Sequence, residues 1–110
     1  FLSLFNAASP ENDLKWPFWA GDRGPRERHR ERTLEALRWF KKHDVPVRGH
    51  VFVWASAKRL PKEIVSLIGT SRQKDIPGLV REHIRGLSAA TAGLVSEWDV
   101  LNEPFNNHEL

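Results

Sequence analysis

Short apolar runs alternate along the chain with longer segments in which apolar residues recur every three or four positions. Residues 47–54 read VRGHVFVW, and this run of β-branched and aromatic residues predicts a strand. Residues 1–5 (FLSLF) predict a short strand near the start. Residues 98–103 (WDVLNE) predict a last strand that runs into a loop.

The longer segments have the period of helices. Between Arg26 and His43, Leu34, Leu37 and Phe40 recur at three-residue intervals, which predicts a surface helix. A short helix is expected over 61–68, before Gly69, and a second long helix over 77–92 with Asp75 as its N-cap. The inner face of that helix is expected to carry Leu79, Val80, His83, Ile84, Leu87 and Thr91. Two prolines and two glycines make residues 17–25 irregular in this interpretation.

The resulting order is strand, helix, strand, helix, strand, which is typical of parallel βαβ units in an α/β fold. The chain has no G-x-G-x-x-G turn and no Walker lysine, so nothing favours a nucleotide-binding sheet. Three parallel strands cannot bury both faces and both edges of their own sheet. We therefore expect residues 1–110 to be part of a (β/α)8 TIM barrel, a fold that takes ~250 residues.

Composition narrows the class of protein. The chain has 110 residues with five Trp and six Phe, which is enough apolar area to argue against disorder. It has no cysteine, which excludes a disulfide framework and a thiol nucleophile. The net charge of +3 gives only a weak field, and the arginines between Asp22 and Arg32 alternate with glutamates, so a nucleic-acid partner is not expected. No apolar run approaches the ~20 residues of a membrane helix, so a membrane partner is not expected either.

Polar side chains follow each predicted strand, at the edge where reactive residues gather in barrels of this kind. Glu11, Asn12 and Lys15 follow the first strand, with the indoles of Trp16 and Trp19 close behind. The second strand contains His50 and ends at Trp54, and the third ends at Asn102 and Glu103. Indoles, amides and charged groups around one cleft suit a sugar, whose C–H face stacks on aromatic rings and whose hydroxyls accept and donate hydrogen bonds.

Three blocks in this order resemble glycoside hydrolase family 10, the retaining endo-β-1,4-xylanases: SPENDLKW at 9–16, VRGHVFVW at 47–54 and EWDVLNEP at 97–104. The resemblance spans nearly the whole chain and about a third of a family catalytic domain of ~300 residues, corresponding to barrel strands two to four. It implies hydrolysis of β-1,4-xylosidic bonds in xylan by the full-length enzyme. It also implies a secreted or periplasmic protein whose polysaccharide substrate is its partner.

The resemblance assigns roles to individual residues. Glu103 falls on the family's acid/base, and Asn102 on the residue that binds the 2-hydroxyl of the sugar at the cleavage site. Three residues match those that bind the next sugar toward the non-reducing end: Glu11, Asn12 and Lys15. His50 and Trp54 match residues that line the cleavage subsite, whereas Asp99 is interpreted as structural. The family's nucleophile is a second glutamate on a later strand, so the 110 residues alone are expected to be inactive.

Two departures from the family pattern keep alternatives open. Ala55 and Ala57 stand where the family usually has His and Gln in His-Ser-Gln, and the loop from Pro17 to Arg32 also diverges. A β-glucanase of a related barrel family and a non-catalytic carbohydrate-binding relic therefore remain alternatives. The remaining histidines lack metal-ligand spacing, so we expect no catalytic metal and no cofactor. The oligomeric state stays open.

Overall fold

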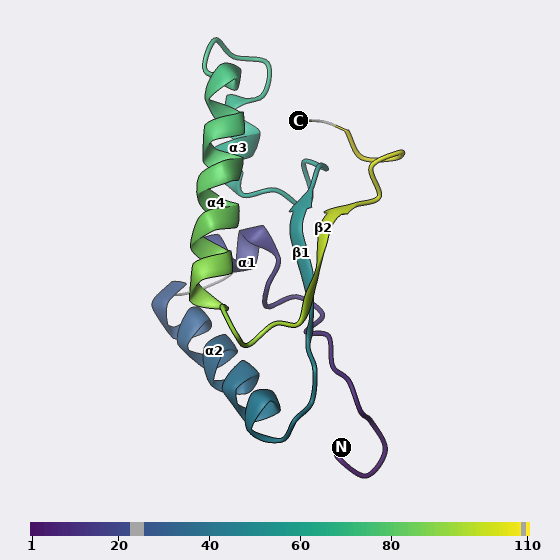
Figure 1. Ribbon diagram of the computed structural model, residues 1–110. Helices are drawn as coiled ribbons and strands as arrows, with labels where there is room; N and C mark the ends of the chain where they lie inside the picture. Colours follow the sequence, from purple (N-terminus) through teal and green to yellow (C-terminus); the bar gives the residue numbers. More distant parts are fainter. Residues whose placement is uncertain (23–25, 109) are drawn as a thin grey trace.

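The computed structural model describes residues 1–22, 26–108 and 110. For Arg26 and Glu27 it describes the backbone only. From residue 26 onward, its elements follow the alternating order of helices and strands that the sequence predicts (Figure 1). They are α1 (Trp16–Ala20), α2 (Arg26–Lys42), β1 (Arg48–Trp54), α3 (Lys62–Leu67), the 3-10 turn η1 (Gln73–Asp75), α4 (Ile76–Ala90) and β2 (Glu97–Asn102). The two long helices and the strands after residue 47 are thereby confirmed to within about two residues of their predicted bounds.

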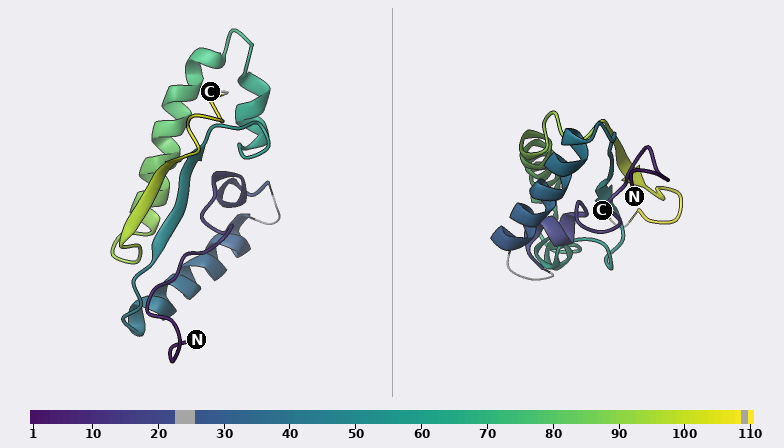
Figure 2. Two further views of the ribbon diagram at one scale, coloured as in Figure 1. Left: turned by 90° about the vertical axis from the view of Figure 1, so that its right-hand side faces the viewer. Right: turned by 90° about the horizontal axis from the view of Figure 1, so that it is seen from below.

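Strands β1 and β2 form a parallel two-stranded sheet, joined by a crossover that contains α3 and α4. The pairing starts at Arg48 opposite Glu97 and ends at Trp54 opposite Asn102, with a shift in register between His50 and Val53. Both arrows point the same way in Figure 1, so the carboxyl ends of the strands lie at one edge. Figure 2 shows α4 running alongside the pair, as a βαβ crossover requires.

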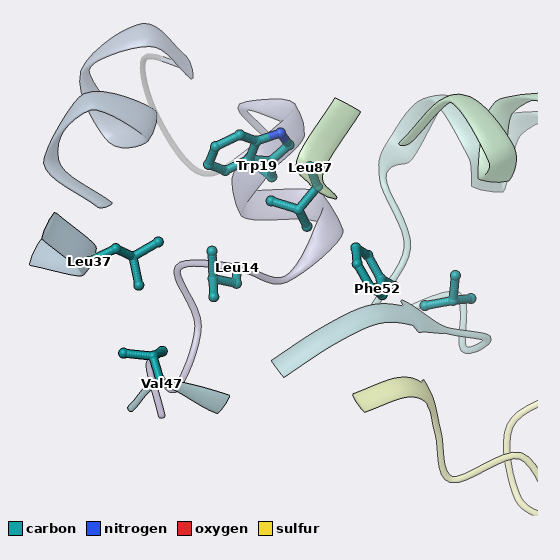
Figure 3. Packing of buried hydrophobic residues seen from close by; sticks show 7 residues of the cluster. Leu14, Trp19, Leu37, Val47, Phe52 and Leu87 are labelled. Carbon is teal, nitrogen blue, oxygen red and sulfur yellow. The ribbon is translucent and has the colours of Figure 1, made fainter. Parts of the chain in front are cut away.

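The core lies between the sheet and the helices. Figure 3 shows the first cluster of buried side chains, in which α1, α2, α4 and β1 all take part. Its members are Leu14, Trp19, Leu37, Val47, Phe52, Val53 and Leu87. A second cluster holds α1, α3 and the start of α4 together and consists of Trp16, Leu60, Ile64, Leu67 and Ile76. These clusters fix the sheet relative to the segment that precedes α1, which carries part of the candidate site.

The predicted strand at residues 1–5 is wrong. Residues 2–4 form a turn closed by the backbone N–H groups of Leu4 and Phe5 on the carbonyl of Phe1, and all five residues are exposed. Parallel pairing occurs instead at a single bridge, where the N–H of Ala8 donates to Pro46 and the N–H of Arg48 donates to Ala8. An apolar run supplies strand propensity, but a strand also needs a partner for its backbone groups, and these five residues have none within the described part of the chain.

Two smaller predictions also fail. Residues 17–25 are not irregular throughout, because Pro17 favours the first turn of α1 and Gly21, at φ 94°, closes it; residues 23–25 lie outside the described part. Asp75 precedes α4 but makes no side-chain capping bond. Its carboxylate instead accepts a hydrogen bond from Arg72 Nε at 3.1 Å.

Candidate functional site

The carboxyl ends of the two strands bring the third sequence block against the second. Trp54 and Asn102 are partners in the sheet register, so Glu103 follows immediately after that pair. Glu103 has φ 49°, a left-handed conformation that is uncommon for a residue with a side chain. Its carbonyl accepts the N–H groups of Asn106 and Asn107, and its Oε2 accepts Asn107 Nδ2 at 3.0 Å. The turn after β2 thus holds an exposed carboxylate in a strained backbone, a combination that is common at functional sites.

Asp99, which lies earlier in β2, is hydrogen-bonded to two basic side chains of β1. His50 Nδ1 lies 2.9 Å from Asp99 Oδ2, and Arg48 Nε donates to Asp99 Oδ1 at 2.9 Å. These hydrogen bonds, that of Arg48 first and that of His50 second, hold the pKa of Asp99 below its usual value. The carboxylate therefore stays ionised near neutral pH and fixes the orientation of the imidazole. In the described part of the chain, no hydrogen bond involves the other ring nitrogen, Nε2.

The first sequence block reaches the same edge from the segment before α1. Lys15 Nζ donates to Asn12 Oδ1 at 2.9 Å and lies 5.5 Å from the centre of the Trp54 ring. The ring of His50 meets the same indole edge-on, with centroids 6.0 Å apart. Burial, and next the charge of Arg59, lower the pKa of Lys15, and the charge of Glu11 raises it by a smaller amount. The structure therefore brings Asn12, Lys15, His50 and Trp54 together, with exposed Glu11 acting on Lys15 through its charge.

Two contacts of the candidate site residues were not predicted. Asp99, interpreted from sequence as structural, touches a candidate site side chain directly. Arg59 lies with its guanidinium carbon 4.7 Å from the centre of the Trp54 ring. In the predicted strand 98–103, alternation puts Asp99 on the same side as Glu103, which is a weak signal in the sequence. No local pattern singles out Arg59.

Other predicted features lie elsewhere. Trp16 and Trp19 are only 8% and 5% exposed and belong to the two core clusters, although both also border a pocket away from the strand ends, between α1, α3 and α4. Trp16 stacks on His83, whose Nε2 binds the Phe52 carbonyl at 3.1 Å. Burial lowers the pKa of His83 to about 4, so this imidazole is neutral at pH 7.

Neither a metal cluster nor a membrane helix emerges from the described residues. In residues 1–22 and 26–108, no three His, Asp or Glu side chains gather as ligands of an ion would. The helices of that same part of the chain are too short or too polar to cross a bilayer.

The chain is similar to fungal xylanases. It is 28% identical over 102 residues to "Endo-1,4-beta-xylanase 2" of Claviceps purpurea, covering 92% of this chain and 29% of that protein. It is also 28% identical over 105 residues to "Endo-1,4-beta-xylanase C" of Phanerodontia chrysosporium, covering 96% of this chain and 25% of that protein. The chain thus spans less than a third of the length of these relatives.

Its fold is similar to that of a solved structure described as "a novel GH10 endoxylanase retrieved from sugarcane soil metagenome". The two chains superpose with a TM-score of 0.73 at 25% identity, over 98% of this chain and 34% of the other. The family model for glycosyl hydrolase family 10 matches from the first residue to the last, across all three motif blocks. With sequence and fold in agreement over residues 1–110, the chain belongs to glycosyl hydrolase family 10.

Proposed function

We propose that the complete protein is a retaining endo-β-1,4-xylanase, and that this chain supplies the region of barrel strands two to four with the acid/base side of the active site. In the described residues, the bridge at Ala8 stands in place of strand two, and β1 and β2 correspond to strands three and four. One observation carries the proposal: Glu103 stands at the carboxyl end of β2, directly after the residue that pairs with Trp54. In barrels of parallel strands, that edge is where catalytic residues lie. The similarity to named xylanases supports the same reaction class.

In this proposal Glu103 protonates the leaving oxygen of the glycosidic bond and afterwards takes a proton from the attacking water. Asn102 binds the 2-hydroxyl of the sugar at the cleavage site. His50, held by Asp99, and Trp54 line that subsite. Glu11, Asn12 and Lys15 hold the next sugar, with Lys15 positioned by its bond to Asn12.

Retaining hydrolysis needs a second carboxylate about 5–5.5 Å from the first, which attacks the anomeric carbon and forms a covalent glycosyl-enzyme. The family resemblance assigns this nucleophile to a later strand of the barrel. Residues 1–110 by themselves therefore bind one side of the substrate and do not turn it over. No cofactor or metal takes part in the proposed chemistry, and the polymeric substrate favours a secreted or periplasmic enzyme.

The test compares Glu103→Ala with the parent enzyme on xylan and on an aryl xyloside whose leaving group needs no proton. We expect the variant to lose xylan hydrolysis and still to form glycosyl-enzyme rapidly from the activated substrate. Glu97→Ala is the matched control, because Glu97 is an exposed glutamate at the opposite end of the same strand. If the Glu103→Ala enzyme hydrolyses xylan at the normal rate, Glu103 is not the acid/base.

The same assay separates the alternatives. A parent enzyme that cleaves cellulose faster than xylan is a β-glucanase with the same chemistry. A parent that cleaves neither substrate and still binds oligosaccharides is a carbohydrate-binding relic. Ala55 and Ala57 are the residues that favour the relic, since the first is buried against the backbone of His108 and neither offers a polar side chain to a sugar.

A further inference from the structure

The loop after β1 presents a second cation to the Trp54 indole. Arg59 is exposed, and its backbone N–H donates to the Ser56 carbonyl at 2.8 Å, which fixes the turn that carries it. Its guanidinium carbon lies 4.7 Å from the centre of the Trp54 ring, and Lys15 Nζ lies 5.5 Å from the same centre. One indole of the proposed cleavage subsite therefore has two cations beside it.

These cations are not neutralised by carboxylates in contact with them. Among the side chains of residues 1–22, 28–108 and 110, no acidic group forms an ion pair with Arg59 or Lys15. The hydrogen-bond partner of Lys15 is the neutral amide of Asn12. The charge of Arg59 also lowers the pKa of Lys15, which means that each cation raises the free energy of the other. An anion placed between them would relieve that repulsion.

The geometry of Arg59 suits one kind of anion. A guanidinium stacked on an aromatic face keeps the N–H groups at its rim available, and these form a planar fork that matches a carboxylate. The hydroxyls of an unsubstituted xylose chain need no such net positive charge. A carboxylate attached to the sugar chain would bind Arg59 through two N–H groups and Lys15 through its ammonium group.

We propose that Arg59, together with Lys15, binds a carboxylate on the glycone side of the substrate, so that this enzyme prefers β-1,4-xylan carrying uronic-acid side groups. The proposal rests on the proposed function, since it names the substrate class of the same site. Arg59 is the specificity-determining residue in it, because Lys15 already serves the neutral sugar chain.

The experiment measures binding by calorimetry in the complete enzyme with Glu103→Ala, so that the ligands are not hydrolysed. The two probes are an unsubstituted xylo-oligosaccharide and one of the same length with a single glucuronic-acid side group. We expect the acidic probe to bind more tightly, and Arg59→Gln to reduce the ratio of the two affinities about tenfold, the equivalent of ~1.4 kcal/mol. Lys58→Gln is the matched control, since it removes one positive charge from the residue that precedes Arg59 in the same loop.

Salt gives a second readout. Raising the ionic strength reduces the preference in the parent more than in Arg59→Gln, which retains only Lys15, because the attraction between exposed charges is screened. Arg59→Lys retains part of the preference, since it keeps the charge and loses the fork. If the neutral probe binds but the ratio is unaffected by Arg59→Gln, the carboxylate site is refuted and the xylanase assignment stands. If neither probe binds and the parent cleaves no xylan, the proposed function and this inference both fail.

Discussion

Gly49, beside His50 in β1, has no room for a larger side chain. It is buried and faces the indole of Trp98 across the sheet. A Cβ atom at Gly49 would lie 2.4 Å from Trp98 Cε3 and 2.6 Å from two further ring carbons. Since carbon atoms in contact rarely approach within about 3.4 Å, the ring would have to move by roughly 1 Å. That movement is resisted from behind, because Trp98 stacks on the buried ring of Phe52 with centroids 4.0 Å apart.

We therefore expect Gly49→Ala to destabilise the enzyme by about 1–2 kcal/mol. Overpacking a core costs ~1–3 kcal/mol, and the restricted unfolded chain of alanine returns ~0.4–1 kcal/mol. Urea unfolding of the complete enzyme measures the change through the midpoint at constant slope. Activity should fall as well, because the displaced strand carries His50 away from Asp99.

Gly86→Ala is the matched control for this substitution. Gly86 lies inside α4, and apart from its chain neighbours and the backbone of its own helix, no atom of the described residues lies within 4 Å of the position that its Cβ would take. Alanine there should stabilise by about 0.5–1 kcal/mol, since it is the better helix former. Opposite signs for one substitution at two glycines test the steric argument directly. A Gly49→Ala enzyme that unfolds at the same urea concentration as the parent, or at a higher one, would refute it.

Three further changes test other contacts. Asp99→Asn keeps the size of the side chain and removes the anionic acceptor of His50, so kcat/KM on xylan should fall at least tenfold with a normal circular dichroism spectrum; unchanged kinetics would contradict a positioning role. Lowering the pH from 7.5 to 4.5 should reduce the stability of the parent by roughly 2–3 kcal/mol more than that of His83→Gln. The reason is that His83 has a pKa of about 4 in the folded protein but takes up its proton near pH 6.5 in the unfolded chain, and equal losses of stability would refute this. Leu87→Ala should cost about 2–5 kcal/mol in urea unfolding, since the side chain is fully buried, and the exposed Ser88→Ala should cost little.

Periodicity predicted the elements whose burial is decided within one segment. In α2 and α4 the apolar stripe places Leu37 and Leu87 in the core, as expected. The apolar run at residues 1–5 could not reveal that no strand forms there, because a strand needs a pairing partner that lies outside the run. Periodicity also could not predict that Trp16 and Trp19 pack inward, since an aromatic residue after a strand has the same pattern in a core and in a cleft.

The site residues divide in the same way. The motif blocks singled out Asn12, Lys15, His50 and Trp54, and the structure brings these four together. Contacts between residues far apart in the sequence could not be predicted from local patterns. Asp99 lies 49 residues beyond His50 in the sequence, and only the pairing of β1 with β2 makes them neighbours.

The charged groups along the sheet are arranged in two unlike clusters, one near the amino ends of β1 and β2 and one at their carboxyl edge. In the first, Asp99 is bound to both Arg48 and His50, so its charge is compensated and its geometry is fixed. In the second, Lys15 and Arg59 share the Trp54 indole, and the described residues give neither of them an ion-pair partner. A compensated cluster gains little from an added ion and serves to orient the imidazole, whereas an uncompensated one binds an anion favourably. Substrate orientation and substrate charge selection are thereby assigned to different sets of side chains, and this separation is why Asp99→Asn and Arg59→Gln should change different kinetic quantities.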